Sequence, residues 1–178
     1  MLMENYINII PNFLSQETID LIFKKYEDSK GKAAFEINEM GRWGADLYAG
    51  NFGPVYIISM YEELAAYFQY RFKSIPEFDE YKTVSACFLH IWQHGSGINW
   101  HHDSLGDNHR VGFTIYLNPN WNVNWGGLFL WEKHGQTGWI CPQYNMAVWL
   151  KSPLWHSVSL ITRAAPTPRF SLQLFLEK

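Results

Sequence analysis

Hydrophobic positions recur at two different spacings along this chain, and the spacing changes near residue 80. The first set follows Ser15, a good N-cap residue, and has the spacing of one helical face: Ile19, Ile22, Phe23 and Tyr26. It predicts a helix that ends at Gly31, because glycine favours helix termination. A second helix is predicted over residues 60–72, since Ser59 and Glu62 have the spacing of a capping box.

Beyond Tyr81 the apolar period becomes two, which is typical of β-strands. In the first such run, one face consists of Val84, Ala86, Phe88, His90 and Trp92. The other face is also mostly apolar, so we expect this strand to be covered on both sides. Shorter runs, separated by Gly, Pro and Asn turns, follow at 98–103, 111–117, 128–131, 146–150, 156–161 and 169–176. This succession predicts a mainly β protein with N-terminal helices, built as a sandwich or jelly roll.

The composition describes one soluble globular domain. The chain has 178 residues, of which 47% are hydrophobic and 17% charged. We expect a single domain over 1–178, with a helical support region at 1–80 and a jelly-roll core at 81–178. The net charge of −3 gives no general attraction to nucleic acid or anionic membranes. No apolar run approaches the ~18 residues of a membrane span, and the first ten residues lack a signal-peptide pattern.

Two further features of composition bear on location and on the site. Cys87 and Cys141 both lie in strand-like contexts, so we expect free thiols and a reducing, cytoplasmic compartment. The high aromatic content indicates either a wide β core or the walls of a pocket. The candidates for pocket walls are Trp43, Trp100, Trp121, Trp125 and Trp155. The Gly-rich segment 41–53 is interpreted as a surface connection or as a lid over a substrate.

The strongest chemical signal is the stretch Trp100-His101-His102-Asp103. In an extended strand, residues two apart point to one side, so His101 and Asp103 can aim at one point while His102 turns away. His156 opens another strand-like run downstream. Two imidazoles and one carboxylate form the facial arrangement of non-haem Fe(II) oxygenases. The pattern therefore predicts a metal site made of His101, Asp103 and His156, and an oxygenase.

Other interpretations of these histidines stay open at this point. A His-x-Asp motif alone is weak, because chance produces it often. His90 and His94 flank a strand end and suit either core or pocket, whereas His109 and His134 lie in polar or turn contexts. A non-catalytic jelly-roll protein that binds a metal or ligand is one alternative. A hydrolase or isomerase that uses zinc or manganese with the same ligands is another.

The last strand supplies a candidate anion site. Its polar face carries an arginine, a hydroxyl and an amide, from Arg169, Ser171 and Gln173. Burying an arginine without an anion is costly, and a carboxylate that accepts two hydrogen bonds from the guanidinium removes that cost. Tyr116 lies on the less apolar face of 111–117 and can donate to the same carboxylate. The alternative is an Arg169 at the exposed start of an edge strand. The first interpretation predicts a cavity for a small dicarboxylate that chelates the metal.

Taken together, these motifs resemble the Fe(II)/2-oxoglutarate-dependent dioxygenases, in particular their prolyl-4-hydroxylase-like branch. The resemblance runs from about residue 88 to 175, roughly half of the chain. The motifs are, in order, Trp92-x-x-Gly95, WHHDS (100–104), Arg110, YLNPNW (116–121), Gly126-Gly127, Pro142 with Asn145, His156-x-Val158 and RFSLQLF (169–175). Their order and spacing are far more specific than any one motif. The N-terminal stretch also resembles the family's first strand and helix.

The resemblance implies a double-stranded β-helix, or jelly roll, with the helices packed on one sheet. It implies Fe(II) bound by His101, Asp103 and His156, with 2-oxoglutarate as cosubstrate and O2 as oxidant. It also implies that Arg169 pairs with the distal carboxylate of 2-oxoglutarate and that Tyr116 hydrogen-bonds to it.

Ser171 follows the family's Arg-x-Ser pattern and is a candidate to assist Arg169. The chain departs from the family pattern in three places. Trp92 stands where the family usually has tyrosine, so a hydrogen bond from this position must come from the indole N–H or be absent. The stretch between His156 and the arginine is longer than usual and makes Arg163 a rival for the clamp. The tandem histidines also allow another register in principle.

The substrate is constrained only by the resemblance. It implies a hydroxylase whose substrate is a prolyl residue in a peptide or protein. A free amino acid or a small natural product is the alternative, because similar compact enzymes act on such molecules. Related halogenases have a small residue in place of the metal-binding carboxylate, so the intact Asp103 favours hydroxylation over halogenation. Desaturation and ring formation are alternatives that use the same carboxylate.

Overall fold

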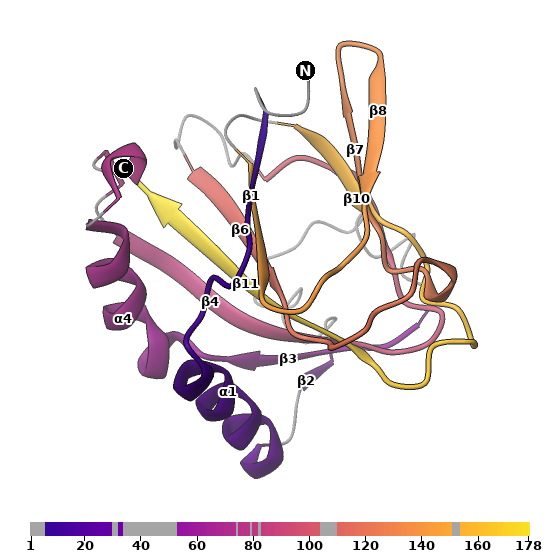
Figure 1. Cartoon of the computed structure of the whole chain (residues 1–178), viewed down its shortest axis with the longest axis horizontal. Coiled ribbons are helices and arrows are strands. Elements are labelled where there is room, and N and C mark those ends of the chain that lie inside the picture. The colour runs from indigo at the N-terminus through magenta and orange to yellow at the C-terminus, as the bar shows by residue number, and fades with distance from the viewer. Residues whose placement is uncertain are drawn as a thin grey trace.

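The computed structural model describes residues 6–29, 32–33, 53–73, 75–78, 80–81, 83–103, 110–150 and 154–178. Two antiparallel sheets pack face to face, and two helices lie against the outer side of the larger sheet (Figure 1). This arrangement confirms the predicted jelly roll with helices on one sheet.

The larger sheet contains strands from both halves of the chain. Its order is β1 (Ile7–Ile10), β9 (Met146–Leu150), β6 (Arg110–Tyr116), β11 (Arg169–Glu177), β4 (Thr83–Trp92), β3 (Val55–Ser59) and β2 (Lys32–Ala33). The smaller sheet has the order β5 (Ile98–His101), β10 (Trp155–Val158), β7 (Phe129–Lys133) and β8 (Gln136–Ile140). The sequence predicted neither β3 nor β8. Strands β1 and β3 show that the first part of the chain contributes to the sheet as well as to the helices.

The two helices begin close to the predicted positions. Helix α1 (Gln16–Asp28) is capped by Ser15, whose hydroxyl accepts a hydrogen bond from the Thr18 N–H. It ends before Gly31, which lies outside the described residues. Helix α4 (Tyr61–Lys73) starts one residue later than predicted. Ser59 is the last residue of β3, and its hydroxyl accepts a long hydrogen bond from the Tyr61 N–H. Two 3-10 turns, at Pro76–Phe78 and Val123–Trp125, lie in connections.

The helices and the larger sheet enclose the main hydrophobic core. Alternate residues of β6 and β11 face this core, as the sequence predicted: Val111, Phe113, Ile115, Phe170, Leu172, Leu174 and Leu176. The helices contribute Ile19 and Ile22 from α1, and Leu64, Phe68 and Phe72 from α4. Because successive strand residues point to opposite faces, the residues between them project toward the smaller sheet. The polar positions of β6 and β11 therefore line the space between the two sheets.

A bulge in β4 corrects one predicted face. Opposite β11, Ala86 pairs with Phe175 and Val84 pairs with Leu176, so Ser85 is an extra residue. An extra residue reverses the alternation on one side of a bulge. Val84 therefore joins Cys87 and Leu89 in the core under the helices, and does not share the face of His90 and Trp92 as predicted.

The structure separates the candidate aromatic residues into core and surface. Trp121 is buried and its ring meets Trp125 edge to face, whereas Trp100 and Trp155 are exposed. Trp43 and the rest of the predicted lid up to residue 52 lie outside the described residues. Both cysteines are free thiols, as expected. Among the described residues, no helix has the length and apolar character needed to cross a membrane.

Candidate metal centre

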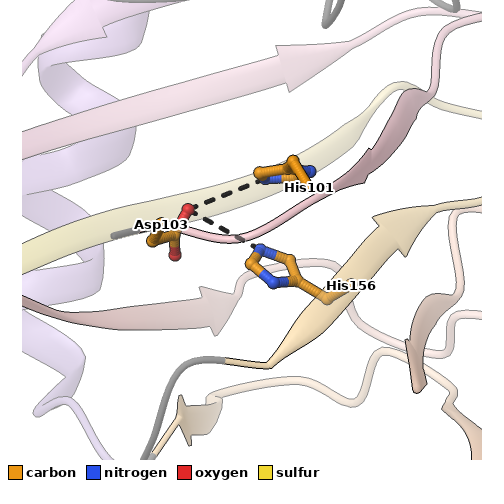
Figure 2. A group of neighbouring side chains, drawn as sticks. All are labelled: His101, Asp103 and His156. Carbon is orange, nitrogen blue, oxygen red and sulfur yellow. Dashed lines mark ion pairs between the residues drawn. The ribbon is translucent and has the colours of Figure 1, made fainter. Parts of the chain in front are cut away.

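Two neighbouring strands of the smaller sheet bring the predicted metal ligands together. His101 ends β5 and pairs directly with His156 of β10. Asp103 follows two residues later, and its Oδ1 lies 3.6 Å from Nε2 of His101 and 3.7 Å from Nε2 of His156. All three side chains offer a ligand atom within 4.8 Å of one another, and they converge on one point in Figure 2. Residues separated widely in the sequence thus form one compact cluster.

The strand geometry also decides between the two tandem histidines. His102 lies on the opposite side from His101, is exposed, and meets the ring of Trp155 edge to face with centroids 5.0 Å apart. It takes no part in the cluster. The predicted register, with His101 directed inward, is the one observed.

Backbone carbonyls set the orientation of both imidazoles. Nδ1 of His101 lies 2.7 Å from the Asn99 carbonyl, and Nδ1 of His156 lies 2.9 Å from the Leu154 carbonyl. A carbonyl only accepts, so each Nδ1 carries the proton and each Nε2 presents a lone pair to the cluster. Burial, reinforced by the neighbouring His156, lowers the pKa of His101 to about 4, against the opposing effect of Asp103. The ring is therefore neutral at physiological pH.

The ligand atoms of the cluster fit a cation. Two imidazole nitrogens and a carboxylate oxygen, all of them electron-pair donors to a metal, face each other within 4.8 Å. A divalent cation resolves this opposition, and two imidazoles plus one carboxylate are ligands that Fe(II) accepts while leaving other positions open. The carbonyl contacts at Nδ1 are the supporting partners that metal-binding histidines usually have.

A buried arginine lies in the same space between the sheets. Arg169 is only 1% exposed, although it is the first residue of β11. Among the described residues no carboxylate pairs with it, and its Nε has no hydrogen-bond partner. Its guanidinium lies over two rings, 5.0 Å from the centroid of Tyr116 and 5.6 Å from that of Trp92. Burial lowers the pKa of Arg169. The interpretation of Arg169 as an exposed residue at a strand edge is therefore wrong.

Three other side chains surround the guanidinium. Ser171 Oγ accepts hydrogen bonds from Arg169 Nη1 at 3.3 Å and from Trp92 Nε1 at 3.1 Å, which leaves its own O–H free to donate. The Tyr116 hydroxyl is buried and has no hydrogen-bond partner among the described residues. Burial raises the pKa of Tyr116 to about 12, so it remains a donor. The surroundings of Arg169 thus offer a cation and two hydroxyl donors, which together suit a carboxylate.

A comparison with protein families gives one match over just more than half of the chain, at residues 87–177, to the model described as the 2OG-Fe(II) oxygenase superfamily. The chain belongs to this superfamily. It is therefore an Fe(II)- and 2-oxoglutarate-dependent oxygenase, and His101, Asp103 and His156 are its candidate iron site. No curated protein matches it in sequence.

Solved structures similar to this oxygenase share its fold at low sequence identity. A prolyl-4-hydroxylase from Pseudomonas putida aligns with a TM-score of 0.69 and 17% identity, over 99% of this chain and 95% of the other. A Trichoplax adhaerens prolyl hydroxylase, in complex with a peptide fragment of the hypoxia inducible factor oxygen degradation domain, gives 0.67 and 19%, over 96% and 83%. A Burkholderia pseudomallei oxidoreductase of the 2OG-Fe(II) oxygenase family gives 0.72 and 16%, over 99% and 87%.

Among the described residues, the other histidines named from the sequence and the second candidate arginine lie outside the metal cluster. His90 is buried on the inner face of β4, and burial together with Arg169 lowers its pKa to about 3. Arg163 lies exposed in a turn, whereas Arg169 is buried. His134 is exposed in the turn between β7 and β8, and His109 lies outside the described residues. The rival arginine is thus a surface residue.

Sequence reasoning missed the residues that make room for the site. Gly127 has φ +63°, and a β-carbon there would lie 2.6 Å from Cδ of Arg169. Gly112 on β6 is similarly close to Asp103. The sequence marks the glycine pair at 126–127 as a motif, but only the folded chain shows which side chain Gly127 contacts.

We expect Gly127→Ala to weaken 2-oxoglutarate binding by roughly 10- to 100-fold, because the added methyl displaces the arginine side chain by a fraction of an ångström or more. The positive φ adds about 1–3 kcal/mol of backbone strain. Gly135→Ala is the matched control: it has φ +76° but nothing lies within 4 Å of the added carbon. Isothermal titration with 2-oxoglutarate should show the loss for Gly127→Ala alone. Equal affinities in both variants would contradict the contact with Arg169.

Proposed function

We propose that this oxygenase hydroxylates an unactivated C–H bond of a prolyl residue in a peptide or protein. One oxygen atom of O2 enters the C–H bond and the other enters succinate, which forms with CO2 from 2-oxoglutarate. The observation that carries the catalytic assignment is the pairing of two incomplete sites in one space. One is a cluster of lone pairs that needs a cation, and the other is a buried guanidinium that needs an anion.

Each residue has a defined part in this proposal. His101, Asp103 and His156 hold Fe(II), whose chemistry when bound is the activation of O2 for attack on a C–H bond. Arg169 pairs with the distal carboxylate of 2-oxoglutarate, and Tyr116 donates its O–H to the same group.

Two further residues fix the clamp and support its donors. Trp92 directs its N–H to Ser171. The role proposed for Trp92 is therefore to hold the serine, with Ser171 donating its O–H to the carboxylate. Trp92 and Tyr116 also cover the guanidinium with aromatic surface, which excludes water and strengthens its attraction to an anion.

The prolyl substrate is supported by the nature of the proteins that share this fold. Two of the structural neighbours are prolyl hydroxylases, and one of them holds a peptide. A free amino acid or small natural product is the competing substrate class.

A screen that measures succinate release tests the proposal. The protein, loaded with Fe(II) and 2-oxoglutarate, is incubated with proline-containing peptides, matched peptides with alanine in place of proline, and free amino acids. We expect succinate and a product heavier by one oxygen atom only with the proline peptides. Turnover confined to free amino acids would replace the prolyl assignment. Absence of the visible charge-transfer band with Fe(II) and 2-oxoglutarate under anaerobic conditions would count against the assigned metal and cosubstrate roles.

A further inference from the structure

The two oxygens of Asp103 have different surroundings. Oδ1 faces both histidines, and both dashed lines in Figure 2 end on this atom. Oδ2 is buried and has no hydrogen-bond partner among the described residues. Leaving a buried carboxylate oxygen without a donor is costly, and carboxylates that bind metals are usually held by a donor on the second oxygen. The surroundings of Oδ2 should therefore contain one.

The side-chain amide of Gln173 lies beside this oxygen. A β-carbon at Gly112 would be 2.6 Å from Asp103 Oδ2 and 3.4 Å from Gln173 Nε2. The two polar atoms therefore flank the same point, and their separation is at most the sum of these two distances. Gly112 has no side chain to stand between them. Gln173 is half-buried on the inner face of β11, on the same strand face as Arg169.

Thr114 sets the orientation of this amide. It faces Gln173 across the β6–β11 pair, and its hydroxyl donates to Gln173 Oε1 at 2.6 Å. With the amide oxygen turned toward Thr114, the NH2 group is on the side of Gly112 and Asp103. The reversed amide would bring Oε1 toward the carboxylate of Asp103, and two oxygens would then face each other. The charge of Asp103 thus favours the orientation in which Thr114 donates to Oε1, and the hydrogen bond from the threonine hydroxyl holds the amide there.

We infer that Gln173 is a positioning residue for Asp103, and that Thr114 orients it. In the metal-loaded protein the amide donates an N–H to Oδ2, which leaves Oδ1 as the single ligand atom of the carboxylate. A carboxylate held in this way does not turn to bind the metal with both oxygens, so the other coordination positions stay open for 2-oxoglutarate and O2. The inference rests on the proposed role of Asp103 as a metal ligand.

The test measures metal binding rather than turnover. Co(II) is titrated into the wild-type protein and into Gln173→Leu, with its visible absorption spectrum as the signal. We expect Gln173→Leu to bind Co(II) about 10- to 100-fold more weakly, the range for loss of a partner that supports a metal ligand. We also expect a changed spectrum, because the carboxylate is no longer held through one oxygen. Thermal unfolding of the metal-free variant checks that it is folded.

A second pair of variants at Thr114 separates orientation from packing. Thr114→Val keeps the shape and removes the hydroxyl, whereas Thr114→Ser keeps the hydroxyl. We expect Thr114→Val to bind Co(II) more weakly than the wild-type protein, and Thr114→Ser to retain the wild-type affinity. Wild-type affinity and spectrum in Gln173→Leu would overturn the role of Gln173 and leave the proposed function standing. If Gln173→Leu does not fold, equal Co(II) binding by the two Thr114 variants overturns the role of Gln173. Failure of the wild-type protein to bind Co(II) or Fe(II) would instead remove the proposed function itself.

Discussion

We expect replacement of His101 with alanine to abolish metal binding and turnover, and the same change at its neighbour His102 to leave both intact. His101 presents Nε2 to Asp103 and His156, while His102 projects outward against Trp155. The loss in metal affinity should exceed the about 10- to 100-fold effect of removing a partner of a ligand, because the ligand itself is gone.

His102→Ala is the matched control for His101→Ala. Both variants lose one imidazole from the same strand end, so effects of expression, net charge and general stability are matched. Fe(II) or Co(II) affinity and succinate formation are the measurements. If His102→Ala were the damaging change, the side chains of this strand end would have to be assigned in the opposite register. If neither change mattered, the cluster would not be the metal site.

We expect replacement of Arg169 with methionine to have two effects of opposite sign. The binding free energy of 2-oxoglutarate should weaken by about 2–5 kcal/mol, the cost of removing one partner of a buried, hydrogen-bonded charge pair. The metal-free protein should become more stable by about 1–4 kcal/mol, because a buried cation without a carboxylate is replaced by an apolar side chain of similar length. A residue with a purely structural role would lower stability when replaced, so the combination identifies an anion clamp.

Arg163→Met is the matched control for this prediction. Arg163 is exposed and was the rival candidate, so its replacement should change neither the affinity nor the midpoint of unfolding. Titration calorimetry with 2-oxoglutarate at saturating metal and thermal unfolding without ligands provide the two readouts. Unchanged affinity in Arg169→Met would mean that the dicarboxylate is bound elsewhere.

The elements that alternate cleanly in the sequence could be predicted, and they carry the site. On β6 and β11 every second residue is apolar, so the polar positions between them had to share a face. That face holds Tyr116 and Arg169. The metal cluster followed from the same period of two, applied to His101 and Asp103. The apolar pattern and the candidate chemistry thus came from one rule.

The features that could not be predicted depend on which segments of the chain pair or meet in the folded structure. The extra residue Ser85 in β4 is visible only against β11, because nothing in the local sequence marks where one strand has gained a residue. Strand β8 is polar on both faces over most of its length, so its sequence has the character of a loop. The contact between Gly112 and Asp103 depends on two segments that meet only in the folded chain.

Strand β5 forms the edge of the smaller sheet and has β10 as its one neighbour within it. His101 lies on β5 and His156 on β10, so an ion bound by both side chains links the two strands. The link resembles a disulfide cross-link, but it is reversible. A metal that binds only the folded site stabilises the pairing of β5 with β10, so this edge of the sheet opens less often. Removing the metal with a chelator should therefore have two effects. It removes the ion needed for catalysis, and it destabilises the sheet edge that holds the reactants in place.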